Sequence, residues 1–328
     1  MTQTRACSEA TNEPLPGTAK AGSVFIAMEH HYGWSHDVLD GGVFGEELSA
    51  QFKEYSARYG AKFQLIRQPG RFGQMGCDGI SVFISRGLPG QESLVRLKLQ
   101  RPEELLDIDL DADTIPGAEP VNHPLVLVCT HGKRDVCCAV KGRPLASTLW
   151  VNFRDFDGDL VWESSHLKGH RFAPVMLVLP WNLNYGRTHA IGAIHAVNEI
   201  LAGRVATEAY RGRGIYKAWA QSAEVAVREL IDGLAGPDDV LVLEDKVADD
   251  GKTARVVVEY APAAGVTADG AELAAGAGAG AAAGAAARKW NVQLALEPIG
   301  EVISSCGDAP KEGFSWIVQD IAEVTSPN

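Results

Sequence analysis

Two cysteines and two histidines near the middle of the sequence have the types and spacing of metal ligands. They lie in the segments CTHGKRDVCC (129–138) and HLKGH (166–170). Thiolate sulfur and imidazole nitrogen are ligands that soft and borderline transition metals prefer. The candidate ligands are Cys129, Cys138, His166 and His170. Because Cys137 directly precedes Cys138, it is an alternative for the second cysteine.

The elements predicted around the cysteines place their sulfur atoms close together. The apolar run HPLVLVC predicts a buried strand that ends at Cys129, and a Gly-containing loop leads from it to a helix. Cys138 lies at the start of this helix, where backbone N–H groups and the helix dipole favour a thiolate. Pro144 is expected in a first helical turn, in the segment RPLASTLW.

The two histidines are four residues apart, which allows two backbone conformations to bring their rings together. In a helix His166 and His170 would share one face, whereas Gly169 between them favours a tight turn. Polar residues in the loop between the cysteines are expected either to orient ligands or to be solvated. These residues are His131, Arg134 and Asp135.

The order of these motifs resembles the sucrase/ferredoxin-like family, whose core is a thioredoxin-like ferredoxin domain. The likeness lies in a C-x8-C segment with an Arg-Asp pair, followed by H-x-x-G-H. In addition, YGRT (185–188) is similar to the family's turn into its last core helix, and VFIAMEHHYGW (24–34) to its opening strand and loop. The resemblance covers mainly residues 120–235.

This resemblance implies a 2Fe-2S cluster and one-electron transfer. The implied cluster ligands are Cys129, Cys138, His166 and His170. Two neutral imidazoles in place of two thiolates raise the reduction potential above that of an all-cysteine ferredoxin. If both histidines bind one iron, this potential falls as the pH rises through their pKa. The expected electron partner is a redox protein or a ferric chelate, and we expect a carrier or reductase component rather than a hydrolase.

The pattern of predicted elements indicates an α/β protein with two thioredoxin-like units and a β-rich C-terminal extension. Residues 1–20 are polar and are expected to be a flexible tail. Residues 21–118 form the N-terminal α/β unit, which resembles a degenerate copy without ligands, and residues 119–233 form the ferredoxin domain. The extension, 234–328, is expected to consist of hairpins around an Ala/Gly-rich loop, 261–287.

Charge and composition exclude several classes of function. The net charge of -12 argues against nucleic-acid binding, which needs a concentrated basic face. No stretch approaches the roughly 18 to 20 apolar residues of a membrane helix, and the polar N-terminus lacks a signal-peptide core. We therefore expect a cytoplasmic protein with reduced thiols.

Two other chemistries use the same residues. A zinc-stabilised binding module would employ the same two cysteines and two histidines, although its cysteines are usually two to four residues apart. Thiol–disulfide exchange on a thioredoxin-like scaffold is the other alternative, but the C-x-x-C motif is absent. The remaining cysteines have no partner at ligand spacing; they are Cys7, Cys77 and Cys306.

Overall fold

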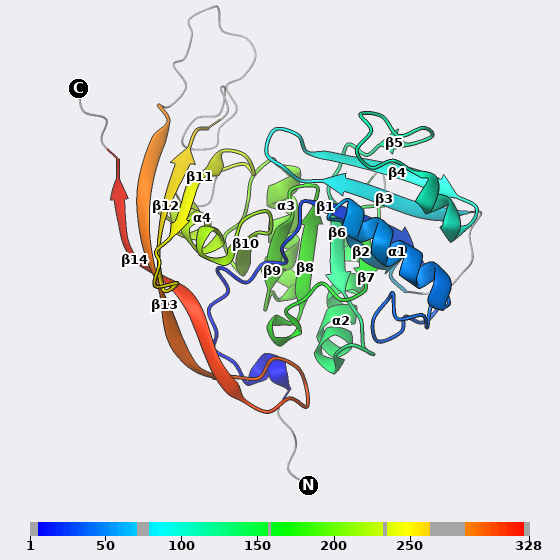
Figure 1. Ribbon diagram of the computed structural model, residues 1–328, viewed down its shortest axis with the longest axis horizontal. Helices are drawn as coiled ribbons and strands as arrows, with labels where there is room; N and C mark the ends of the chain where they lie inside the picture. The colour runs from blue at the N-terminus through cyan, green and yellow to red at the C-terminus, as the bar shows by residue number, and fades with distance from the viewer. Residues whose placement is uncertain (1–5, 71–78, 157–158, 232–234, 263–285, 325–328) are drawn as a thin grey trace, which may run out of the picture.

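Two β-sheets organise the described part of the chain (Figure 1). The computed structural model describes residues 6–70, 79–156, 159–231, 235–262 and 286–324. A mixed ten-stranded sheet runs through the first two thirds of the chain, and a separate four-stranded antiparallel sheet follows. The predicted class, α/β with a β-rich C-terminal extension, is confirmed.

The N-terminal half of the large sheet consists of apolar strands around one amphipathic helix. Its elements are β1 (Val24–Glu29), α1 (Glu46–Arg58), β2 (Lys62–Arg67), β3 (Ile80–Arg86), β4 (Ser93–Leu99), the 3-10 helix η3 (Pro102–Asp107) and β5 (Glu119–Pro120). Strand β1 pairs in parallel with β2 and antiparallel with β3. Alternate residues of β1 face opposite sides of the sheet, so Ile26 and Met28 pack with Phe52 of α1, whereas Phe25 and Ala27 face the other core.

The second half repeats the same strand order. Its elements are β6 (Leu125–Cys129), α2 (Val136–Phe153), β7 (Val161–Ser164), the 3-10 helix η4 (His170–Phe172), β8 (Val175–Leu179), β9 (Leu183–Gly186), α3 (Ala190–Leu201), β10 (Tyr210–Arg213) and α4 (Ala218–Leu230). The order β7-β6-β8-β9 matches β2-β1-β3-β4 in the first half. In both, two parallel strands flank a helix and two antiparallel strands follow, which is the thioredoxin-like arrangement.

The two halves join through their equivalent edge strands. Strand β2 pairs antiparallel with β7, where Ile66 is opposite Ser164 and Arg67 is opposite Glu163. An ion pair between Arg67 and Glu163, 2.8 Å long, reinforces this short contact. A single sheet therefore connects both thioredoxin-like units, while the proposed unit boundaries stay a prediction.

Helix α2 begins earlier than the position of its proline indicates. The helix starts at Val136, and the side chain of Asp135 accepts a hydrogen bond from the Cys137 amide as its N-cap. Pro144 therefore lies inside the helix and not in its first turn, which corrects the sequence-based expectation. The Asp135 cap satisfies an otherwise unpaired amide at the helix start, and this outweighs the preference of proline for a first turn.

The C-terminal extension packs against α4, and the connection between its last two strands reaches the start of α2. Its strands are β11 (Val240–Val247), β12 (Thr253–Tyr260), β13 (Arg288–Val302) and β14 (Lys311–Glu323), paired in sequence order. The predicted hairpins are confirmed, whereas most of the expected Ala/Gly-rich loop lies outside the described residues. The connection between the long strands β13 and β14 lies beside the N-terminal 3-10 helix η1 (Cys7–Glu9), at the bottom of Figure 1.

In the described residues, no helix has the length and apolar character needed to span a membrane.

Candidate metal centre

Three of the four expected ligands converge at one end of strand β6. Cys129 is the last residue of β6, and Cys138 lies in the first turn of α2; both are about 1% exposed. Their Sγ atoms and a ring nitrogen of His166 all lie within 4.8 Å of one another. Helix α2 approaches the strand closely because Gly142 faces it, where a Cβ atom would lie 1.9 Å from the Cys129 carbonyl oxygen.

A turn, and not a helix, brings the second histidine to the same place. Gly169 has a left-handed backbone, with φ of 83°, and His170 begins the 3-10 helix η4 directly after it. The ring centroids of His166 and His170 are 5.1 Å apart. A Cβ atom at Gly169 would also lie 2.5 Å from the guanidinium of the buried Arg211. Glycine is thus favoured here by both backbone conformation and space.

Several ring nitrogens of the two histidines make no hydrogen bond in the described structure. Nδ1 of His166 and both ring nitrogens of His170 are buried and lack a hydrogen-bond partner among the described residues. Buried polar atoms are usually hydrogen-bonded, because an unpaired one costs desolvation free energy. Two sulfurs and one imidazole therefore meet here, and the second imidazole lies beside the first. These are donor types that a mixed cysteine–histidine cluster uses.

Electrostatics favour the ligand forms of Cys129 and His170, whereas Cys138 keeps its proton. A hydrogen bond from the Cys138 thiol lowers the pKa of Cys129 well below its usual value, and His166 lowers it further despite burial. The same hydrogen bond raises the pKa of Cys138, so the pair holds one proton and one thiolate. Burial lowers the pKa of His170, which keeps the ring neutral. Thiolate and neutral imidazole are the forms that bind metals.

The sulfur side and the histidine side of this group face different surroundings. Cys129 and Cys138 belong to an apolar core on one face of the large sheet, together with Leu127 and Phe172. The histidines instead line a cavity of about 670 Å³. The cationic residues around this cavity are Lys20, Arg134, Lys168 and Arg171, and the carboxylates are Asp37 and Asp308. Access from outside is therefore on the histidine side.

The loop between the cysteines is anchored to the N-terminal half. A ring nitrogen of His131 lies 2.7 Å from the carbonyl oxygen of Ser35 and donates to it, and Arg134 contacts His36 at 3.1 Å. His131 is 2% exposed, so it is a buried residue and not a solvated one. Of the two readings of this loop, the structure therefore supports a role in positioning Cys129 and Cys138.

The comparison with known families agrees with this geometry. A sequence model of the sucrase/ferredoxin-like family matches residues 15–212, more than half of the chain. The chain belongs to this family. No protein of curated function and no solved structure matches the chain. Membership agrees with the repeated thioredoxin-like order, and the matched range includes all four candidate ligands.

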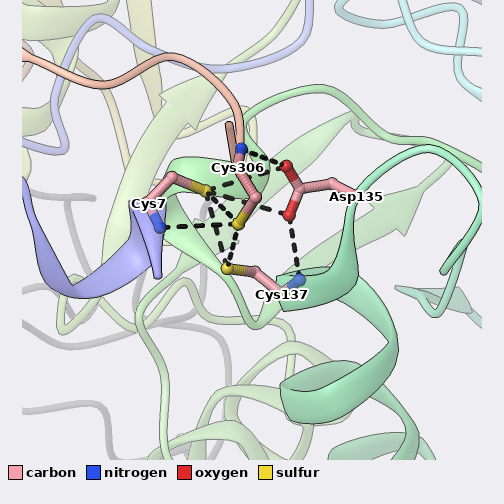
Figure 2. Close-up of side chains that lie close together, drawn as sticks. All are labelled: Cys7, Asp135, Cys137 and Cys306. Atoms are coloured by element: carbon pink, nitrogen blue, oxygen red, sulfur yellow. Dashed lines mark hydrogen bonds between the residues drawn. The ribbon is translucent and has the colours of Figure 1, made fainter. Parts of the chain in front are cut away.

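Three other cysteines lie together at a place that sequence spacing does not indicate. Cys7 and Cys306 have no partner at ligand spacing, yet in the structure both contact Cys137 (Figure 2). Cys137 is therefore turned away from Cys129, and Cys138 is the cysteine beside it. Cys77 lies outside the described residues. The sequence feature that relates to this second group is Asp135, because the side chain of this N-cap residue lies beside the three cysteines.

Proposed function

We propose that this protein is a one-electron carrier whose 2Fe-2S cluster is held by two cysteines and two histidines. The proposed ligands are Cys129, Cys138, His166 and His170. When bound, this group supplies reversible one-electron exchange at a potential above that of all-cysteine ferredoxins. The observation that carries the proposal is the set of buried, unpartnered histidine nitrogens beside a sulfur pair that holds a thiolate.

The surrounding residues would control access to the centre. The apolar core that contains Phe172 and Leu127 excludes water from the sulfur side. Electrons would therefore enter or leave on the side where His166 and His170 line the cavity, which we call the histidine edge. The side chain of His170 is 12% exposed there. His131 and Asp135 would hold the loop and helix that carry the two cysteines.

Charge around the cavity favours an anionic electron partner. Arg171 is paired with Glu13 at 2.5 Å, and burial disfavours the charged form of Lys20, so the positive charge of the cavity wall comes mainly from Lys168 and Arg134. Asp37 and Asp308 lie in the same wall, so Lys168 and Arg134 would attract an anionic partner locally, on a protein whose net charge is -12. An anionic ferric chelate and an acidic redox protein both meet this requirement.

Iron and sulfide analysis of anaerobically purified protein tests the proposal directly. We expect two irons and two sulfides per chain in the 2Fe-2S cluster, a red-brown colour, and an electron paramagnetic resonance signal after dithionite reduction. Cys138→Ser should lose iron and His166→Cys should change the signal. His195→Cys is the matched control for His166→Cys, since His195 is an exposed residue of α3 outside both groups of candidate ligands.

Two outcomes would contradict the proposal. Colourless protein that holds zinc at these four residues would support the zinc-stabilised module instead. Spectra unchanged in both Cys138→Ser and His166→Cys would remove these residues from the ligand set, whatever metal is present.

A further inference from the structure

Three cysteines from distant parts of the chain meet beside a buried carboxylate, outside the proposed cluster ligands (Figure 2). Cys7 belongs to the N-terminal 3-10 helix η1, Cys137 to the first turn of α2, and Cys306 to the connection between β13 and β14. The carboxylate is that of Asp135, the N-cap of α2. All four donor atoms lie within 4.8 Å of one another.

The spacing of the three sulfur atoms is nearer to that of ligands on one metal ion than to that of a disulfide. The Sγ atoms are separated by 3.5 Å between Cys7 and Cys137, 3.2 Å between Cys137 and Cys306, and 3.4 Å between Cys306 and Cys7. Tetrahedral thiolates at about 2.3 Å from zinc are about 3.8 Å apart, whereas bonded sulfurs are about 2.05 Å apart. In addition, a disulfide joins only two sulfur atoms and would leave the third cysteine of this group unbonded.

Hydrogen-bond donors contact two of the sulfur atoms and the carboxylate. The Ser8 hydroxyl donates to the Cys137 sulfur at 3.3 Å, and the Cys7 amide donates to the Cys306 sulfur at 3.5 Å. The Asp135 carboxylate accepts from the Cys137 and Cys306 amides, each at 2.9 Å. Such outer contacts orient metal ligands and stabilise thiolates, and the N-terminus of α2 adds favourable partial charge.

We propose that Cys7, Cys137 and Cys306 bind one divalent, thiophilic cation of the zinc type, with a carboxylate oxygen of Asp135 as the fourth ligand. Binding releases the three thiol protons to solvent and forms three metal–sulfur bonds and one metal–oxygen bond. Three thiolates, one carboxylate and a dication leave two net negative charges, which the surrounding amides and the start of α2 offset. Four ligands complete a closed, structural tetrahedral site.

This site would fasten the 3-10 helix η1 and the connection between β13 and β14 to the helix that carries Cys138. The residue pairs that it links are 130, 169 and 299 positions apart in the sequence. Ser304 and Ser305, next to Cys306, form part of the wall of the cavity at His170. Holding this connection in place would therefore also hold the wall beside the histidine edge.

Metal analysis of the full-length protein and its variants tests this proposal. After equilibration with zinc and removal of the excess, we expect one zinc per chain in the parent protein. Cys7→Ser and Cys306→Ser should each lose zinc and keep iron, whereas Cys129→Ser should lose iron and keep zinc. This reciprocal pattern separates the second site from the proposed cluster, so either proposal can fail without the other.

Cobalt binding can be measured with Cys7, Cys137 and Cys306 all intact. The result therefore does not depend on whether a variant at one of these positions folds. In Cys129→Ser, which should lack the coloured cluster, added Co²⁺ should give thiolate charge-transfer bands and the visible bands of tetrahedral cobalt. X-ray absorption at the zinc edge of the parent should show three sulfur neighbours at about 2.3 Å and one oxygen. Asp135→Asn should keep the sulfur shell and weaken zinc binding.

Three results would overturn the proposal. One is a parent protein that takes up neither zinc nor cobalt in addition to its iron. Another is zinc that remains in both Cys7→Ser and Cys306→Ser. The third is a disulfide among these three cysteines in protein purified with zinc present, detected as a mass lower by two hydrogen atoms.

Discussion

Oδ2 of Asp135 lies 3.8 Å from Nε2 of His170 and 3.8 Å from the sulfur of Cys7. One carboxylate therefore contacts both groups of metal-ligand residues. Burial alone would raise the pKa of Asp135, but hydrogen bonds from the Cys306 and Cys137 amides lower it to about 2. The carboxylate is thus ionised at neutral pH, as an N-cap and as a neighbour of a neutral imidazole.

The turn at Gly169 should be sensitive to a single methyl group. Gly169→Ala should lower the free energy of unfolding by about 1–2 kcal/mol for its left-handed backbone, and further because the Cβ would meet Arg211. It should also reduce iron content, since His170 follows directly. Chemical denaturation and iron analysis measure both effects.

Gly203→Ala is the matched control for this turn. Gly203 has a similar φ of 77° but has no atom within 4 Å of its would-be Cβ. We expect it to show the backbone cost alone and normal iron content. Equal losses of stability in the two variants would contradict a role for the Arg211 contact.

Stability should rise with pH because of the buried Lys20. Burial, with a contribution from Lys168, lowers the pKa of Lys20 from 10.5 to about 7. Between these values the unfolded chain binds a proton that the folded protein lacks, so folding is favoured as pH increases. The slope approaches about 1.4 kcal/mol per pH unit for one proton. Lys20→Met should flatten the dependence of unfolding free energy on pH between pH 7 and 9.

Removal of the Lys20 charge also gives a direct comparison near neutral pH. Since the charged form of Lys20 is disfavoured in the folded protein, Lys20→Met should be more stable than the parent at pH 7 and approach it at pH 9. Parallel curves for the two proteins would show that Lys20 is not buried in this way.

The reduction potential should depend on pH if histidines bind the iron. Oxidation favours loss of the second imidazole proton, so the potential should fall above the pKa of the oxidised state. The limiting slope for one electron and one proton is about 59 mV per pH unit. Protein-film voltammetry measures it, and His166→Cys should reduce the slope. A flat potential from acidic to alkaline pH would exclude histidine ligation.

The positive side chains Lys168 and Arg134 in the cavity wall should affect the rate of reaction with anionic acceptors. Lys168→Glu should slow reduction of an anionic ferric chelate, up to about tenfold at low ionic strength, with less effect in high salt. Stopped-flow absorbance measures this rate. The control is Lys53→Glu, the same change in charge at an exposed position of α1. Equal slowing in both variants would show that net charge, and not the charge of the cavity wall, controls the rate.

Local patterns in the sequence determined most of the secondary structure and the candidate ligands. The apolar strand ending at Cys129, the amphipathic helix before Gly60 and the C-terminal hairpins follow from alternation and periodicity over short windows. The ligand motifs are also local, since each lies within ten residues. Family membership follows from the same motifs. These features require no knowledge of contacts between distant segments.

Only the tertiary structure decided how the cysteines are divided. Successive residues of a helix point about 100° apart, so Cys137 and Cys138 must face different neighbours, and packing decides which one meets Cys129. Cys7 and Cys306 are 299 residues apart, and no periodic pattern relates them. They meet because strands β13 and β14 are long enough to carry their connection back to the start of α2, a contact set by sheet length and packing.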